Sequence, residues 1–227
     1  MIKKNITYFS ISFITFLVLV LLLTNIQGQV VIQKNDTTIT VVPRQGLDTT
    51  IDVDGKVALF IGDSHTSNHS NGWQVLVCRQ TGMKMKNVSV SGKTTYWMLN
   101  MAVYTMKEGI NYCFIYGGAN DMYTSSITPQ EAVDNIKGII KICKGRGVTP
   151  IVITGFDPTL TATPNKNYIP KYIKFQNLLL TTINDAQVID TRVTKKTDCW
   201  DGLCHMAPSG HKKIAEKVIS DMKLKIK

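Results

Sequence analysis

The sequence lacks several patterns that would assign a function directly. Cysteine is scarce, with 5 in 227 residues. None of the cysteines has the Cys-x2-Cys spacing with a second ligand pair that structural zinc sites use, so no metal site is predicted. Acidic residues number only 16 against 26 lysines and arginines, which gives a formal net charge of +10. The lysines nevertheless form no dense stripe interleaved with aromatic residues, so we expect a solvated basic surface and no nucleic-acid partner.

Charged residues are also absent from residues 6–26, directly after Lys3 and Lys4. An apolar run of this length can span a bilayer, whereas a cleaved signal has an apolar core of about 7–15 residues. An uncleaved anchor is therefore favoured, with cleavage after the small residue Gly28 as the alternative. Because positive charge stays inside, both alternatives export the rest of the chain. The sequence predicts either a membrane-anchored protein with an extracytoplasmic domain or a secreted one.

The chain divides into three parts. Residues 1–28 form the anchor or signal peptide, and residues 29–55, rich in Thr, Asp and Val without a helical period, form a linker. Residues 56–227 form one globular domain in which short apolar runs alternate with longer amphipathic segments. The expected strands are 57–61, 87–90, 112–116, 149–153 and 187–189. The expected helices are 72–81, 95–107, 129–144, 171–183 and 208–223.

This alternation of strand and helix is typical of an α/β fold. The strands are apolar enough to be buried on both faces, as in a parallel sheet. We therefore predict a three-layer α/β/α sandwich with a doubly wound parallel sheet of five strands, whose functional crevice lies at the carboxyl ends of the strands. The clearest helix begins at Thr128-Pro-Gln-Glu131, a capping box with proline at the first helical position.

A serine follows the first expected strand, in the stretch LFIGDSHT (59–66). Taken alone, Gly-Asp-Ser is more often a polar turn than a nucleophile, and the Gly-x-Ser-x-Gly elbow is absent because Thr66 stands at its last position. The segment SGKT (91–94) also fails as a phosphate loop, since Asn87 occupies the position of the required glycine. Nucleotide binding is therefore not expected.

The other strand ends supply what Ser64 alone lacks. Gly92 follows the second strand, Asn120 lies in GGAND (117–121) after the third, and His205 closes DGLCH (201–205) after the fifth. These groups suit acyl transfer: Ser64 attacks a carbonyl carbon and His205 takes the proton. The N–H groups of Ser64 and Gly92 and the Asn120 amide form the oxyanion hole.

These four blocks, in this order, resemble the SGNH (GDSL-type) hydrolases, and the resemblance covers about residues 56–224. It implies a flavodoxin-like three-layer sandwich and a Ser-His-Asp site without metal or cofactor. It also implies ester hydrolysis, frequently the removal of acetyl groups from carbohydrates. Asp63 and Asp121 are then expected to be structural acids that bond the backbone of neighbouring loops.

The chain departs from the family pattern at the acid. The family places its acid three residues before the histidine, where this chain has Gly202, and Asp201 lies four residues before. Cys199 and Cys204 stand five apart in a polar loop of an exported chain, so a disulfide is favoured there. Such a bridge could let Asp201 reach His205. The alternative is a Ser-His dyad oriented by a backbone carbonyl, with Asp198 only a loop acid.

Two further residues and one loop bear on the pocket. His65, beside the nucleophile, and Tyr123 are candidate substrate contacts, and the long loop 155–168 is a candidate pocket wall. His211 is expected at the surface of the last helix.

The sequence thus predicts an exported serine esterase. It would hydrolyse carboxylic esters, O-acetyl esters above all, on a carbohydrate or cell-surface glycan, with no cofactor. An O-acyltransferase using the same residues and a non-catalytic glycan-binding or structural module of the same fold remain as alternatives. The expected partners are the ester substrate and a membrane, through residues 1–28.

Overall fold

The computed structural model describes residues 34–35, 38–39, 50–67, 69–124, 126–160, 167–199 and 205–227, and the chain divides into two units, 1–49 and 50–227. In the first unit, β1 (Lys34–Asn35) pairs with β2 (Thr38–Ile39) in antiparallel fashion, inside the expected linker. The expected membrane segment, 6–26, lies outside the described residues. None of the described helices is both long and apolar enough to cross a bilayer.

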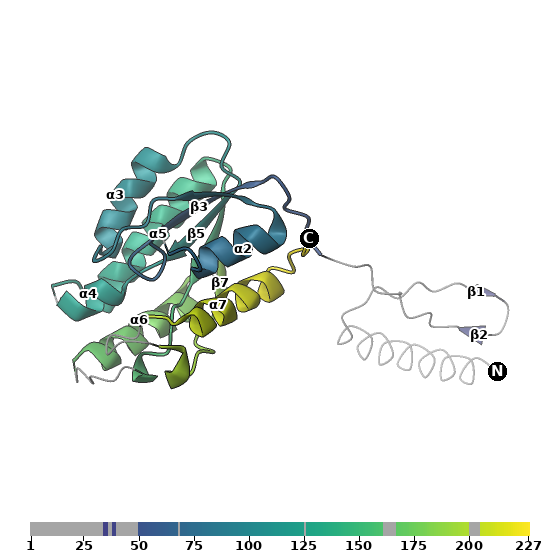
Figure 1. Ribbon diagram of the computed structural model, residues 1–227. Helices are drawn as coiled ribbons and strands as arrows, with labels where there is room; N and C mark the ends of the chain where they lie inside the picture. The colour runs from purple at the N-terminus through teal and green to yellow at the C-terminus, as the bar shows by residue number, and fades with distance from the viewer. Residues whose placement is uncertain are drawn as a thin grey trace, which may run out of the picture. The chain divides into compact units, whose positions relative to one another are not determined.

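The second unit is built on a parallel sheet with the strand order β4-β3-β5-β6-β7. The strands are β3 (Val57–Gly62), β4 (Lys84–Asn87), β5 (Tyr112–Tyr116), β6 (Thr149–Ile153) and β7 (Gln187–Ile189). Helices α2 (Trp73–Thr81) and α7 (Pro208–Asp221) pack together on one face, and α3 (Thr95–Thr105), α5 (Pro129–Gly145) and α6 (Tyr168–Thr182) pack on the other (Figure 1). The predicted doubly wound three-layer sandwich is confirmed.

Aromatic packing fills the layer between the central strands and α2. The rings of Phe60 and Phe114 stack at 4.8 Å, and Trp73 packs edge-on against Phe60 at 5.4 Å. All three side chains are completely buried. The capping box predicted for α5 is present: Glu131 N–H donates to the Thr128 hydroxyl at 3.2 Å, and Thr128 N–H donates to the Glu131 carboxylate at 2.7 Å.

The second strand and one helix differ from the prediction. The strand lies at Lys84–Asn87 instead of 87–90. This strand pairs with β3 alone, so it is an edge strand and can expose Lys84 and Lys86 to solvent. The apolar residues on which the prediction was based come after the end of the strand. A short helix, α4 (Ala119–Thr124), begins inside the glycine-rich segment and was not predicted.

The folded unit begins at Thr50 instead of Lys56. Ile51 N–H donates to the Lys223 carbonyl at 2.7 Å, Lys225 N–H donates to the Ile51 carbonyl at 3.0 Å, and the Lys225 ammonium pairs with Asp52 at 3.2 Å. Residues 50–55 of the expected linker therefore pack against the C-terminal segment.

Candidate active site

A tight turn after β3 presents Ser64. The Asp63 carbonyl accepts hydrogen bonds from the N–H groups of Thr66 and Ser67 at 3.1 and 2.9 Å, and the Asp63 carboxylate accepts one from His65 N–H at 3.0 Å. Gly62 is required before the turn, because a Cβ there would lie 2.3 Å from the Tyr116 carbonyl oxygen. The turn leaves Ser64 half-buried at the carboxyl edge of the sheet.

The structure brings Ser64 together with His205, 141 residues away in sequence. Ser64 Oγ lies 3.1 Å from His205 Nε2, within hydrogen-bond reach. His205 is half-buried and is followed by Met206, Ala207 and then α7. A β-bridge between Cys199 and Met206, with Ala207 N–H donating to the Asp198 carbonyl at 2.7 Å, closes the base of the segment that carries His205.

Two N–H groups at the carboxyl edge of the sheet, those of Ser64 and Gly92, have no acceptor among the described residues. Gly92 has a φ of 75°, which suits the third residue of a type II turn, and Lys93 N–H donates to the Val90 carbonyl across that turn at 3.4 Å.

Asn120 lies at the same edge, in α4. Its Nδ2 donates to the Lys93 carbonyl at 3.1 Å and lies 3.5 Å from the Asp63 carboxylate. The amide is thus held between the Gly92 turn and the Ser64 turn. Asn120, Gly92 and Ser64 therefore lie at the same edge of the sheet, and their role as oxyanion donors stays a prediction.

Asp121 joins α4 to the start of α3. Both its carboxylate oxygens accept from Thr95 N–H, at 3.0 and 3.1 Å, and the Thr95 hydroxyl donates to it at 2.5 Å. Thr94, the residue at the N-cap of α3, makes no side-chain cap, so Asp121 satisfies this helix terminus from another element. Asn135 of α5 completes the network by donating to the Thr95 hydroxyl at 3.0 Å.

The two acids of these motifs are buried and electrostatically perturbed. Burial raises the pKa of Asp63 to about 7; the His65 N–H opposes this rise, and the nearby Asp121 carboxylate adds to it. Burial likewise raises the pKa of Asp121, against the hydrogen bonds from Thr95. Both acids bond loop backbone, as the sequence predicts for structural residues.

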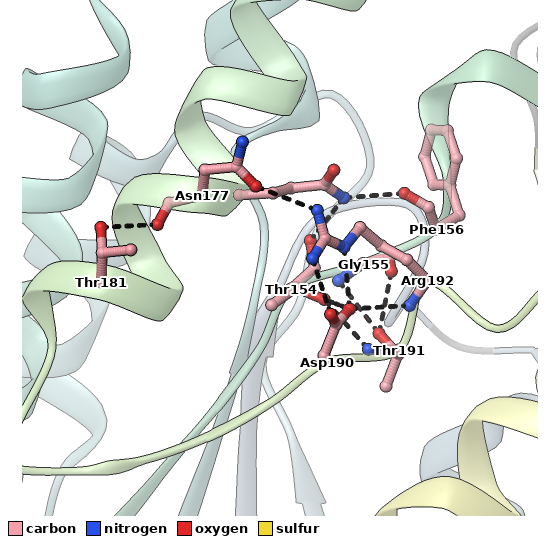
Figure 2. A network of polar contacts seen from close by, with 9 residues as sticks. Thr154, Gly155, Phe156, Asn177, Thr181, Asp190, Thr191 and Arg192 are labelled. Carbon is pink, nitrogen blue, oxygen red and sulfur yellow. Dashed lines mark hydrogen bonds and ion pairs between the residues drawn. The ribbon is translucent and has the colours of Figure 1, made fainter.

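A second polar network lies past β6 and β7 and fixes Gly155 and Phe156 (Figure 2). The Thr191 hydroxyl donates to the Gly155 carbonyl at 2.9 Å and accepts from Gly155 N–H at 3.1 Å. Gln176 donates to the Phe156 carbonyl at 2.7 Å. Because the Phe156 ring centre lies 4.9 Å from that of His65, this network positions one wall beside the Ser64 turn.

The acid expected to orient His205 is not among the residues that the structure describes, since Asp201 and Cys204 lie in the segment 200–204. Cys199 is disulfide-bonded, whereas Cys78, Cys113 and Cys143 are free. Asp198 is engaged elsewhere: its carboxylate pairs with Lys213 at 2.6 Å and accepts from Lys195 N–H at 2.6 Å. Burial opposes these contacts, but together they lower the pKa of Asp198.

A cavity of about 220 Å³ opens beside Ser64. Its lining comprises Ser64, His65, Ser67, His69, Ser91, His205, Met206 and His211. Of the two candidate substrate contacts, His65 is in this lining, whereas Tyr123 is 52% exposed, outside it, and packs edge-on against Tyr168 at 5.9 Å. His211 is not at the surface but 7% exposed in the cavity wall, and the sequence reasoning missed both it and His69. Their positions in the sequence could have indicated them: His69 follows Ser64 closely, and His211 lies in the first turn of the helix after His205.

Among the described residues, no group of three or more His, Cys, Asp or Glu side chains could hold a metal ion.

Known proteins resemble this chain in fold and in family. A lipolytic protein of the G-D-S-L family from Desulfitobacterium hafniense has a TM-score of 0.62 at 14% identity, covering 72% of this chain and 98% of its own. The esterase EstA from Pseudoalteromonas has a TM-score of 0.56 at 15% identity, covering 74% and 97%. The acetylxylan esterase Axe2 from Geobacillus stearothermophilus has a TM-score of 0.59 at 13% identity, covering 77% and 99%. A search of curated proteins found no match.

At these identities the structures establish the fold alone, and the family rests on the sequence. The family model described as GDSL-like lipase/acylhydrolase matches residues 59–218, which include Ser64, Gly92, Asn120 and His205. Because that match spans most of the folded unit, this chain belongs to the family of GDSL-like lipases and acylhydrolases and is a GDSL-type esterase.

Proposed function

We propose that this esterase removes short acyl groups, acetyl above all, from hydroxyls of a carbohydrate or cell-surface glycan, with Ser64 as nucleophile and His205 as general base. The observation that carries the proposal is the 3.1 Å contact between Ser64 Oγ and His205 Nε2, beside two N–H groups that have no acceptor among the described residues.

The reaction follows from that contact. Ser64 Oγ attacks the ester carbonyl carbon while His205 Nε2 takes the hydroxyl proton, which gives a tetrahedral intermediate. Its collapse breaks the bond to the alcohol oxygen, which receives the proton from His205. Water, deprotonated by His205, then attacks the acyl carbon; the bond from that carbon to Ser64 Oγ breaks, His205 returns the proton to Ser64 Oγ, and the carboxylic acid is released. The same steps with a sugar hydroxyl in place of water would transfer the acyl group.

The negative charge on the carbonyl oxygen would be held by Ser64 N–H, Gly92 N–H and the Asn120 amide. Loss of one such donor typically costs about 10²–10³ in turnover. The turn at Gly92 and the Asp121–Thr95 bonds fix the segments that carry these donors, and the Asn120 amide would exchange its bond to the Lys93 carbonyl for one to the oxyanion.

His205 needs its other ring nitrogen oriented. We propose Asp201 for this role, because Asp198 is already bonded to Lys213. A carboxylate at Nδ1 keeps the proton off Nε2 and stabilises the imidazolium.

Two observations favour a small acyl group on a polar alcohol. Serine and histidine side chains make up most of the lining of the cavity beside Ser64, which favours a polar alcohol. An acetylxylan esterase is among the proteins of similar fold. The apolar residues 6–26 would place this activity outside the membrane, with the chain anchored or released.

The test uses the full-length chain in detergent, with a fluorophosphonate probe and with 4-nitrophenyl acetate. Wild type and the exposed control Ser220→Ala should label and turn over, and Ser64→Ala should do neither. A wild type that labels and hydrolyses no better than Ser64→Ala would overturn the proposal. Products formed with and without an added sugar alcohol separate hydrolysis from transfer.

A further inference from the structure

The cavity beside Ser64 contains more histidine than the proposed chemistry uses. All 4 histidines of the chain line it, yet only His205 has a role in the steps above. His69 and His211 lie with their ring centres 5.9 Å apart.

His211 has a fixed tautomer. Trp73 N–H donates to its Nδ1 at 3.3 Å, which caps α2 at a terminus where Gly72 offers no side chain. A neutral imidazole that accepts at Nδ1 carries its proton on Nε2. Burial, together with the neighbouring His69 and His205, lowers the pKa of His211 to about 4. At neutral pH this residue is therefore an uncharged hydrogen-bond donor.

His69 has the complementary polarity. Its Nε2 lies 3.1 Å from the carbonyl oxygen of Ser64, which can only accept, so Nε2 carries the proton. In this tautomer Nδ1 is the acceptor. Ser67, which also donates to the Ser64 carbonyl, and Ser91 add hydroxyl groups to the same lining. A donor imidazole beside an acceptor imidazole suits a hydroxyl group, which both accepts and donates.

The lining of the cavity suits the leaving-group side of the proposed reaction. It includes His205, which must reach the alcohol oxygen, and neither Gly92 nor Asn120, which must reach the carbonyl oxygen. We propose that His69 and His211 form a leaving-group subsite that binds the hydroxyls of a polyol, a sugar or a glycerol unit, next to the ester oxygen. This inference rests on the proposed function and names the alcohol that the site selects.

Two substitutions separate the helix cap from the proposed contact. His211→Asn places an amide oxygen near the position of Nδ1, so it can still accept from Trp73 N–H, but it has no group at Nε2. His211→Gln places an amide nitrogen near Nε2 instead. A merely structural role for His211 predicts that Asn is the better replacement, whereas a substrate contact predicts that Gln is.

The experiment compares three acetates that differ only in the alcohol: butyl acetate, glycerol monoacetate and 6-O-acetylglucose. Full-length wild type should prefer a hydroxylated ester. His211→Asn should lower kcat/KM for that ester about tenfold more than for butyl acetate, the size expected for one hydrogen bond, with an unfolding temperature near that of wild type. Lys212→Ala, at the exposed residue next to His211, should keep the wild-type ratio of kcat/KM for the two esters.

Each outcome decides. If His211→Asn does not fold, the exposed variant His69→Ala must show the same loss of selectivity. A loss confined to the glucose ester assigns the subsite to sugars, and one confined to the glycerol ester assigns it to glycerides. If the ratio of kcat/KM for the hydroxylated ester to kcat/KM for butyl acetate is the same in wild type, His211→Asn and His69→Ala, the subsite is overturned. The proposed esterase activity is not affected by that result. A wild type with no Ser64-dependent labelling would instead remove the proposed function.

Discussion

The oxyanion half and the base half of the candidate site are held by different means. Ser64, Gly92 and Asn120 stand at strand ends that are tied together by buried hydrogen bonds, above all those between Asp121 and Thr95. His205 instead belongs to a segment whose described contacts are the Cys199–Met206 β-bridge, the bond from Ala207 N–H to the Asp198 carbonyl, and the ion pair of Asp198 with Lys213, whose side chain is 35% exposed.

This difference predicts which changes affect stability and which affect chemistry. A buried carboxylate that loses its donors cannot recover them from water, so damage to the oxyanion half should lower the free energy of unfolding as well as turnover. Solvent compensates part of any loss in the base half. Changes there should act mainly through the orientation and charge of His205.

The largest effect should come from the acid that orients His205. Asp201→Asn should lower kcat about 10⁴-fold with little change in unfolding temperature, because an amide at Nδ1 favours the wrong imidazole tautomer. Asp198→Asn is the matched control, since that acid bonds Lys213. Steady-state kinetics with 4-nitrophenyl acetate measure both. A dyad oriented by a backbone carbonyl would leave Asp201→Asn nearly as active as wild type.

In the oxyanion half, Asp63 should make stability depend on pH. Its folded pKa of about 7 lies above the unfolded value of 3.8, so between these values the folded state keeps a proton that the unfolded state releases. The free energy of unfolding should therefore fall as pH rises from about 4 to about 7 and then level off. Urea titrations across this range measure the slope. Asp63→Asn should flatten it, and an unchanged slope in this variant would contradict the assignment.

Thr95→Val should act on both stability and turnover. It removes the hydroxyl that joins Asp121 to Asn135, at a cost of about 1–3 kcal/mol for partners left unsatisfied. We expect kcat to fall about tenfold with KM unchanged, because the donors at Gly92 and Asn120 lose their alignment. Thr181→Val is the control, since its hydroxyl bonds only the Asn177 carbonyl on the surface of α6. Equal losses in the two variants would refute a special role for Thr95.

The sequence could predict the sheet and the four motif residues because these depend on local patterns. Short apolar runs set four of the five strands, and glycines mark the turns at their ends. It could not place β4, because an edge strand tolerates Lys84 and Lys86, which carry no apolar signal.

The sequence also missed what long-range packing decides. His211 reads as a surface residue after Gly210, yet the contact between α2 and α7 buries it against Trp73. The fold brings His69 next to it through the Ser64 turn, which no spacing in the sequence indicates.

The smallest effect should come from the ion pair of the base half. Lys213→Met removes the ammonium 2.6 Å from the buried Asp198 carboxylate. Because that carboxylate keeps its bond from Lys195 N–H and solvent reaches the position of Lys213, we expect a loss of about 1 kcal/mol in the free energy of unfolding at pH 7. Against the effect of burial, the ion pair lowers the pKa of Asp198 in the folded state. Its contribution to the free energy of unfolding is therefore present above the pKa of an unfolded aspartate and is lost as pH falls through the pKa of folded Asp198. The difference in free energy of unfolding between wild type and Lys213→Met should shrink below about pH 4. Lys212→Met, which removes an exposed pair with Glu216 at 3.8 Å, should change stability by less at either pH. If Lys213→Met instead cost as much as Thr95→Val, the base half would be as rigidly held as the oxyanion half, and the two would no longer differ in kind.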